Sequence, residues 1–157
     1  MPASEHSTSL PPLAGTFRVG VDIVRISRIA ESLERFGQRF LDRVFTVDEI
    51  AYATSAPALS AERLAARFAA KEAALKALQL ADKGIRWTDL EVRRAQSGDC
   101  ELWLHGAAYA AAMSSGFANL ALSLSHEGDY AAAVVMAQRG GLPSSINLSI
   151  PATTKEL

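Results

Sequence analysis

Residues 61–80, with the sequence AERLAARFAAKEAALKALQL, carry the strongest structural signal in the chain. Alanine and long straight-chain residues dominate this stretch, and neither glycine nor proline interrupts it, which favours one long helix. At about 100° per residue, one apolar stripe follows this helix: Leu64, Phe68, Leu75 and Leu78. Lys71 projects within the stripe and Glu72 lies at its edge. Two charged side chains therefore border the expected core.

The segment before this helix is predicted to hold a strand and two helices. Residues 17–24, FRVGVDIV, are rich in β-branched side chains and short enough for a buried strand. Apolar residues then recur at helical spacing over residues 26–40, with Ser27 as the expected N-cap. Thr46 and Glu49 have the spacing of a capping box, so a short helix should follow Thr46.

The segment after the long helix is predicted to be mostly strands. Strand-like segments surround residues 90–92 and 102–104, and an alanine-rich helix should end near Gly116. Residues 120–125 alternate leucine with small side chains, the turn sequence EGD follows, and residues 130–137 are again apolar, which indicates a hairpin. We therefore expect an α+β fold, a mostly antiparallel sheet packed with a long central helix, rather than a doubly wound one.

Composition limits the class of protein. Residues 17–138 suit one domain, residues 1–16 are interpreted as a flexible leader, and residues 139–157 as a flexible tail. The formal charge of -1 argues against nucleic-acid binding, and no apolar run approaches the length that spans a bilayer. Cys100 is the only cysteine, which excludes an intramolecular disulfide and favours a reducing, cytoplasmic compartment.

Two acidic residues suggest a metal site. Asp22 lies within an apolar strand, where a carboxylate needs a partner, unless the strand ends there and Asp22 caps the next helix. Glu72 and Lys76 are one helical turn apart and could form an ordinary exposed ion pair. If Asp22 and Glu72 converge, the two carboxylates suit Mg²⁺, and the adjacent Arg67 and Lys71 suit phosphates.

His126 is a further candidate binding residue. It ends an alternating strand immediately before a turn, which places it at the rim of the domain. A histidine at a strand end can equally serve the structure by bonding a nearby carbonyl group. Both interpretations stay open on the residues alone.

Three segments resemble the ordered motifs of the holo-acyl-carrier-protein synthase family, over about residues 19–137. They are GVDIV at 20–24, RFAAKEAALK at 67–76, and SLSH at 123–126 followed by YAAAV at 130–134. The resemblance implies an α+β transferase that moves 4′-phosphopantetheine from coenzyme A to a serine of an apo-acyl carrier protein or carrier domain, in support of fatty acid biosynthesis. The serine hydroxyl attacks the β-phosphorus and 3′,5′-adenosine bisphosphate leaves.

The resemblance also implies roles for individual residues. Asp22 and Glu72 correspond to the Mg²⁺ ligands. Arg67 and Lys76 correspond to residues near the coenzyme A phosphates, and His126 to a histidine on the nucleotide side. Glu72, or a water it holds, is the candidate base for the serine proton, and Lys76 would steady the developing phosphate charge.

Two turns depart from the family pattern. The family usually has a glycine-rich turn after the Lys-Glu helix, whereas residues 79–84 here are QLADKG. Within that segment, Lys83 and Gly84 are the expected coenzyme A contacts. A Gly-Lys-Pro turn that is common in the family is replaced by Gly98-Asp99-Cys100.

The resemblance implies a docking surface and an assembly as well. Arg28, Arg35 and Arg39 share one face of the expected first helix and would receive the acidic carrier, although Glu31 and Glu34 between them also fit a solvated face. Family members are commonly homotrimers with active sites between subunits. A non-catalytic coenzyme A binding module is the alternative, whereas a P-loop kinase is disfavoured because its phosphate-binding signature is missing.

Overall fold

The computed structural model describes residues 17–140, so the expected leader and nearly all of the expected tail lie outside the described residues. The expected α+β class is confirmed. In chain order the elements are β1 (Phe17–Arg25), α1 (Ile26–Phe36), α2 (Gln38–Val44), α3 (Val47–Thr54), η1 (Pro57–Leu59), α4 (Ser60–Leu78), η2 (Trp87–Asp89), β2 (Leu90–Arg94), β3 (Cys100–Leu104), α5 (Gly106–Ser114), β4 (Phe117–Glu127) and β5 (Tyr130–Arg139).

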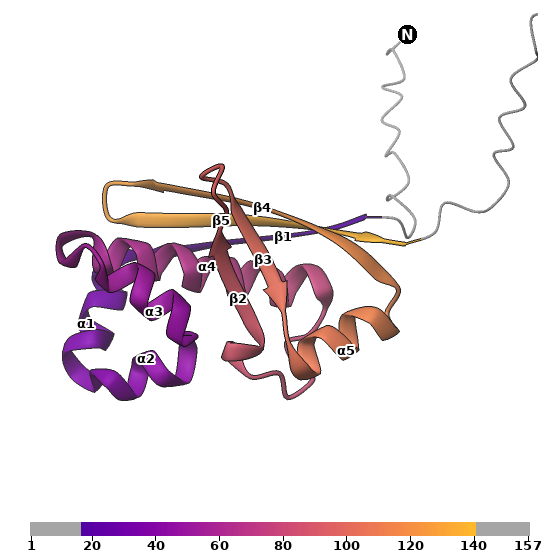
Figure 1. The fold of residues 1–157 in the computed structure, drawn as a ribbon, viewed down its shortest axis with the longest axis horizontal. Helices are drawn as coiled ribbons and strands as arrows, with labels where there is room; N and C mark the ends of the chain where they lie inside the picture. The colour runs from indigo at the N-terminus through magenta and orange to yellow at the C-terminus, as the bar shows by residue number, and fades with distance from the viewer. Residues whose placement is uncertain (1–16, 141–157) are drawn as a thin grey trace, which may run out of the picture.

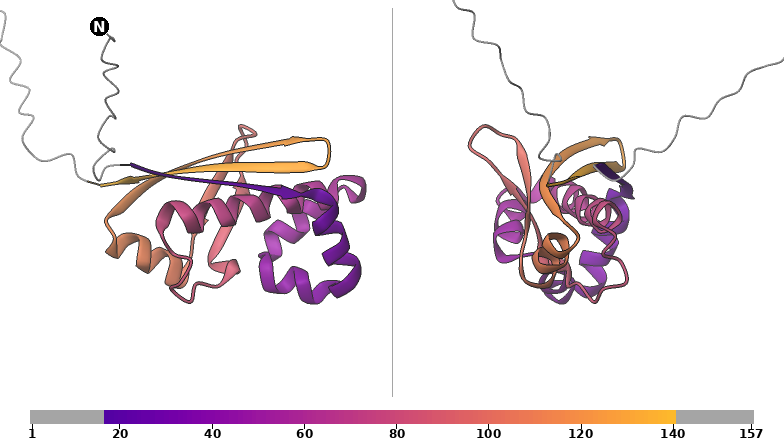
Figure 2. Two further views of the ribbon diagram at one scale, coloured as in Figure 1. Left: turned by 180° about the vertical axis from the view of Figure 1, so that it is seen from behind. Right: turned by 90° about the vertical axis from the view of Figure 1, so that its right-hand side faces the viewer.

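The elements form a sheet above a layer of helices (Figure 1). The upper sheet has the order β1-β5-β4 with antiparallel neighbours, and the hairpin β2-β3 forms a second, smaller sheet. The long helix α4 packs against β1 and β5. Figure 2 shows that α1, α2 and α3 gather beneath one end of the upper sheet, while α5 lies toward the other end.

Strand β1 lies directly on α4 because Gly20 has no side chain. A Cβ atom at Gly20 would overlap the carbonyl oxygen of Ala73 and would lie 2.8 Å from the Ala77 nitrogen. Alternate residues of a strand point to the same face, so Asp22 faces α4 as Gly20 does. The close approach at Gly20 therefore carries Asp22 to the helix.

The first helix is interrupted, and the expectation of one helix over residues 26–40 is wrong. Gly37, with φ of 52°, separates α1 from α2. The apolar period continues across this position, but a positive φ ends the helical hydrogen-bond ladder and glycine adopts it at little cost. Arg39 therefore lies on α2, whereas Arg28 and Arg35 lie on α1.

Of the two predicted helix N-caps, one is confirmed and the other is wrong. Thr46 and Glu49 form the expected capping box at the start of α3. Ser27 is not the N-cap of α1, because the helix begins at Ile26. Instead, Asp129 of the β4-β5 turn accepts hydrogen bonds from the Ser27 N–H at 2.8 Å and the Ser27 hydroxyl at 2.6 Å.

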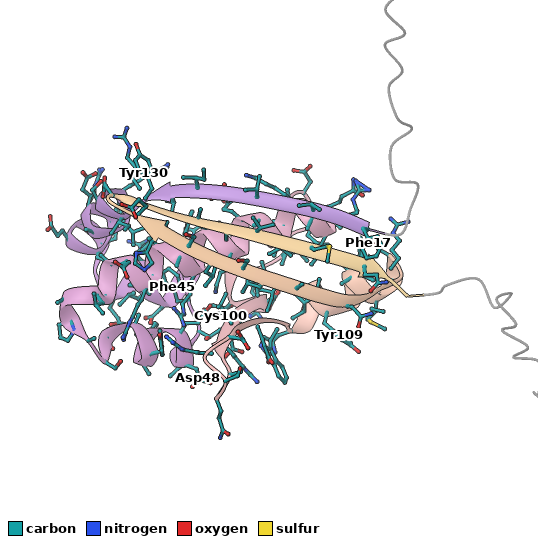
Figure 3. All side chains as sticks on the ribbon, turned by 90° about the horizontal axis from the view of Figure 1, so that it is seen from above. Phe17, Phe45, Asp48, Cys100, Tyr109 and Tyr130 are labelled. Atoms are coloured by element: carbon teal, nitrogen blue, oxygen red, sulfur yellow. The ribbon has the colours of Figure 1, made fainter. Side chains whose placement is uncertain are left out.

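The outer face of the upper sheet is apolar and uncovered. Within residues 17–140 no helix lies over it (Figure 3). Five of its large side chains are between 42% and 64% exposed: Val19, Val21, Ile23, Val134 and Met136. Folding of this part of the chain alone therefore leaves a sheet face that water solvates poorly.

Candidate functional site

Asp22 is held by a lysine of α4. The Lys76 Nζ lies 2.8 Å from the Asp22 Oδ1 and 3.0 Å from the Val21 carbonyl oxygen. The lysine side chain is 51% exposed and the aspartate side chain 18% exposed. The strand continues to Arg25, so the alternative that Asp22 caps the next helix is wrong. A charged pair therefore stands at the edge of the core, open to solvent.

Glu72 shares this edge. It lies one helical turn before Lys76 on α4, and residues at that spacing occupy the same helix face. Lys76 forms its ion pair with Asp22, and the described residues show no Glu72–Lys76 pair of the kind the sequence suggested. Lys76 therefore contacts one carboxylate directly, and a second acid lies one turn away on the same helix face. Within residues 17–140, no group of three or more acidic, histidine or cysteine side chains is arranged to hold a metal.

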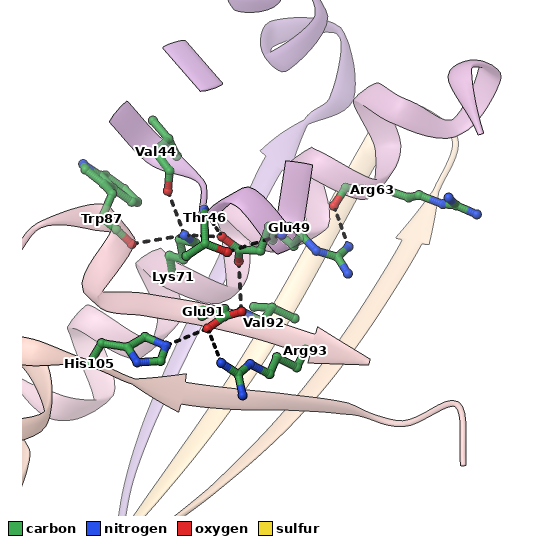
Figure 4. A network of polar contacts seen from close by, with 11 residues as sticks. Val44, Thr46, Glu49, Arg63, Lys71, Trp87, Glu91, Val92, Arg93 and His105 are labelled. Atoms are coloured by element: carbon green, nitrogen blue, oxygen red, sulfur yellow. Dashed lines mark hydrogen bonds and ion pairs between the residues drawn. The ribbon is translucent and has the colours of Figure 1, made fainter. Parts of the chain in front are cut away.

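Lys71 has a different environment from the one expected. Its side chain and that of Glu49 are both 0% exposed, and the Lys71 Nζ lies 2.7 Å from the Glu49 Oε2 (Figure 4). Burial lowers the pKa of Lys71 below its ordinary value, and Glu49 opposes that change. The expectation that Lys71 suits a phosphate is wrong, because the ammonium is enclosed in the core.

Glu49 is the centre of this buried group. Its Oε1 accepts the backbone N–H of Val92 at 2.9 Å, and its Oε2 accepts that of Thr46 at 2.9 Å. Sequence analysis identified Glu49 only as the partner in a capping box. A lysine inside the apolar stripe indicates a buried acidic partner. The sequence pattern does not identify Glu49 as that partner.

Arg67 lies in a cluster of arginines around Tyr52. Its side chain stacks on the Tyr52 ring at 4.2 Å, Arg63 stacks on the same ring at 4.6 Å, and Arg94 donates a hydrogen bond to the Tyr52 hydroxyl. Arg67 is only 3% exposed, its Nε has no partner, and burial lowers its pKa. Among the described residues, no carboxylate forms an ion pair with any of the three arginines.

His126 stands apart from Asp22 within one chain. Asp22 is paired with Ala133, which is paired with Leu124, so His126 lies on the third strand and two residues further along. Its side chain is 57% exposed, and its Nε2 lies 3.4 Å from Glu62. The structure does not bring the expected nucleotide-side histidine to the expected metal ligands of the same chain.

The turn after α4 keeps a left-handed residue without a glycine. Gln79 has φ of 56° and ψ of 47°, and its N–H bonds to the last carbonyl groups of the helix. It is the only non-glycine residue with positive φ in the described part of the chain. Lys83 and Gly84 follow on an exposed turn, with φ of 65° at Gly84. The helix therefore ends in a left-handed conformation even though a glutamine occupies the position.

The three expected docking arginines are all exposed. Arg28 and Arg35 are one heptad apart on α1, and Arg39 follows on α2. Beside Arg39 is a pocket of about 350 Å³ lined by Phe36, Arg39, Phe40 and Arg43. Phe36 is one of the apolar residues at helical spacing in residues 26–40, a pattern that predicts a place on the core face, but the break at Gly37 leaves it half exposed. The surface therefore combines positive charge with aromatic rings.

Asp129 is a residue whose role sequence analysis missed. Hydrogen bonds from the side chain and backbone of Ser27 lower the pKa of Asp129 below its ordinary value. The aspartate thereby fixes the start of α1, which carries Arg28 and Arg35, to the turn that follows His126. An aspartate is common in turns, so its presence at residue 129 needed no further explanation. Nothing in the sequence indicated that it would bond the start of a helix 102 residues away.

Comparisons with known proteins agree with this geometry. Residues 18–135 match the family model described as the 4′-phosphopantetheinyl transferase superfamily. The holo-[acyl-carrier-protein] synthase of Koribacter versatilis is 47% identical over 118 residues, covering 74% of this chain and 94% of the relative. That of Carboxydothermus hydrogenoformans is 45% identical over 122 residues, covering 76% and 96%.

Solved structures of holo-acyl-carrier-protein synthases are also similar to this chain. The chain superimposes on a Chronobacterium ammoniagenes ACPS-CoA complex with a TM-score of 0.72 and 34% identity, covering 81% of this chain and 100% of the other. The Helicobacter pylori holo-[acyl-carrier-protein] synthase in complex with coenzyme A gives a TM-score of 0.67 and 29% identity, covering 76% and 99%. The chain therefore belongs to the 4′-phosphopantetheinyl transferase superfamily, with holo-[acyl-carrier-protein] synthases as its relatives.

Proposed function

We propose that this chain transfers 4′-phosphopantetheine from coenzyme A to a serine of an apo-acyl carrier protein, in support of fatty acid biosynthesis. The observation that carries the proposal is the ion pair between Asp22 and Lys76 beside Glu72, in a chain of this superfamily. A half-exposed ion pair contributes little to the stability of the fold. Two acids and a lysine at the rim of the core are better suited to binding a charged phosphate substrate.

Asp22 and Glu72 would hold Mg²⁺. Such an ion is usually bound through one or two carboxylates, with waters and substrate phosphates as its remaining ligands. The donor set fits this pattern, because two carboxylates border the site and the Asp22 Oδ2 has no hydrogen-bond partner among the described residues. Bound Mg²⁺ would neutralise negative charge on the phosphate oxygens.

The side chains of the site would position the reactants and move one proton. A bond forms between the carrier serine oxygen and the β-phosphorus, the bond to the α-phosphate oxygen breaks, and 3′,5′-adenosine bisphosphate leaves. Glu72, or a water it holds, takes the serine proton. Lys76, half exposed and already aimed at the site, donates hydrogen bonds to the phosphate oxygens as their charge develops.

Coenzyme A would be bound by Arg67, Lys76, Lys83, Gly84 and His126. The cluster around Arg67 supports part of this assignment, since three neighbouring guanidinium groups without a carboxylate partner attract an anion. His126 fits only if subunits share the site. A homotrimer built on the apolar outer face of the sheet would cover that face and could bring His126 of one subunit toward Asp22 of another.

The carrier would dock on Arg28, Arg35 and Arg39. Carrier proteins are acidic, so an exposed row of arginines suits them, and the pocket beside Arg39 offers aromatic rings to an apolar side chain. We place the enzyme in the cytoplasm because its lone Cys100 suits a reducing compartment. None of the described helices is long and apolar enough to cross a bilayer.

Intact-mass measurement of an apo-carrier tests the proposal. The carrier is incubated with this chain, coenzyme A and Mg²⁺, with a carrier whose acceptor serine is replaced by alanine as the control. We expect a mass increase of one phosphopantetheine on the serine-containing carrier alone. Binding of coenzyme A without any mass increase would identify the alternative, a non-catalytic binding module.

A further inference from the structure

Two buried charges beneath the site have no part in the proposed reaction. Lys71 and Glu49 are both enclosed in the core, and their charged groups are 2.7 Å apart. Moving two charges out of water is costly, and an apolar pair of similar volume is often as stable or more stable. Stability alone therefore does not explain why the core contains this pair.

The pair connects separate elements through directional bonds (Figure 4). A lysine ammonium has three N–H donors, and that of Lys71 uses them on the Glu49 carboxylate, the Val44 carbonyl at 2.7 Å and the Trp87 carbonyl at 3.1 Å. Glu49 in turn accepts backbone N–H groups at the start of α3 and in β2. Because every donor is used, the network allows little rotation of α4 relative to α2, α3 and β2.

The network reaches both halves of the proposed site. Lys71 immediately precedes Glu72, so the burial of one side chain determines where the other leaves α4. Val44 is the last residue of α2 and follows Phe40, a wall of the docking pocket, by one helical turn. The network is thus a direct link between the surface expected to receive the carrier and the carboxylate expected to act on its serine.

We propose that Lys71 and Glu49 are positioning residues, which hold α2, the helix that carries Arg39, in place relative to Glu72. The inference rests on the proposed transferase function. Both side chains are enclosed, so they act through the elements they join and not on either substrate. Their removal should affect the approach of the carrier serine, since a misplacement of about 1 Å can cost about 100-fold in rate. Binding of coenzyme A should persist.

The test is the double variant Glu49→Gln with Lys71→Met, which removes both charges at similar volume and leaves no unpaired ion. We expect kcat/KM for the carrier to fall by about 10- to 100-fold, while the Kd for coenzyme A, measured by calorimetry, stays within about twofold. All rates are measured well below the Tm of each variant. Lys71→Gln with Glu49→Gln, which retains one hydrogen bond, serves if the first variant does not fold.

The matched control is Glu91→Gln. Glu91 is also a buried carboxylate, but it bonds His105 and Arg93 on the β2-β3 side and has no described hydrogen bond or ion pair with α1 or α2. A general loss of stability would affect both variants alike. Carrier kinetics of the double variant equal to those of Glu91→Gln, at equal folded fraction, would overturn the inference. Failure of the unaltered chain to modify any carrier would instead overturn the proposed function.

Discussion

Lys71 and Lys76 lie five residues apart on the same helix and each pairs with a carboxylate, yet their surroundings are opposite. Lys71 and Glu49 are completely enclosed, whereas Lys76 is half exposed beside Asp22. An enclosed pair must keep its partners, because an uncompensated buried charge is severely destabilising. A pair open to solvent contributes little to stability and can exchange its partner for a ligand. The same two residue types therefore serve the fold at one position and the chemistry at the other.

The largest expected effect separates the two lysines by stability. Lys71→Met leaves Glu49 buried without its partner, so we expect a loss of about 3–5 kcal/mol in the free energy of unfolding. Lys76→Met should cost less, about 1 kcal/mol, because the lysine side chain is 51% exposed and water can take its place beside the Asp22 carboxylate. Urea denaturation of both variants measures the difference. Equal losses would show that burial does not distinguish the two pairs.

For activity, unlike stability, we expect the exposed site to be the more sensitive one. Asp22→Ala and Glu72→Ala should each lower the transfer rate by about 100-fold or more, because each removes a carboxylate proposed to bind Mg²⁺. Their Tm values should stay close to that of the unaltered chain. Asp48→Ala, at an exposed acid on α3, is the control and should transfer normally. Full activity of either site variant at ordinary Mg²⁺ would exclude the proposed metal site.

A smaller effect is expected at the docking surface, which lies beyond the buried network. Replacing Arg28, Arg35 and Arg39 together by glutamate should raise KM for the carrier about tenfold or more, since like charges would repel the acidic partner. The KM for coenzyme A should be nearly unchanged. Steady-state kinetics with each substrate varied in turn gives both values.

The smallest effect concerns the end of the helix that carries both lysines. Gln79→Gly should stabilise the chain by about 1 kcal/mol, because glycine adopts positive φ without the steric cost that glutamine bears. Thermal unfolding measures the gain, and Gln79→Ala should show none. A destabilised glycine variant would mean that the Gln79 side chain makes a contribution larger than its backbone strain.

Local sequence signals predicted most of the fold. The long helix, the capping box at Thr46, the strands around residues 90–92 and 102–104, and the final hairpin all follow from spacing between neighbouring residues, and each is confirmed. Helical period alone could not reveal the break at Gly37, because apolar residues recur on both sides of it. The hydrogen bond from the Ser27 N–H to Asp129 could not be predicted for another reason, because the acceptor belongs to a turn far along the sequence.

The site was predicted less completely than the fold. Resemblance selected Asp22 and Lys76, and the structure joins them across 54 residues of sequence. Residue spacing could not decide whether Lys76 pairs with Asp22 or with Glu72, because Glu72 is one turn away on the same helix. The proposed roles of Arg67, Lys83, Gly84 and His126 stay predictions. Their proposed partners are coenzyme A and, for His126, a second subunit, and the hydrophobic period of one chain encodes neither.

The cap provided by Asp129 has a consequence for how the protein is made. The ribosome releases α1 early, but the residue that satisfies the first N–H groups of that helix is synthesised 102 positions later. Strand β1 likewise cannot form its sheet hydrogen bonds until β5 is synthesised, because β5 is its only strand neighbour within the described residues. A short helix without its cap and its tertiary support is marginal in water. We therefore expect a nascent chain halted before residue 129 to show no affinity for carrier, so that recognition begins only when synthesis of the catalytic unit is almost finished.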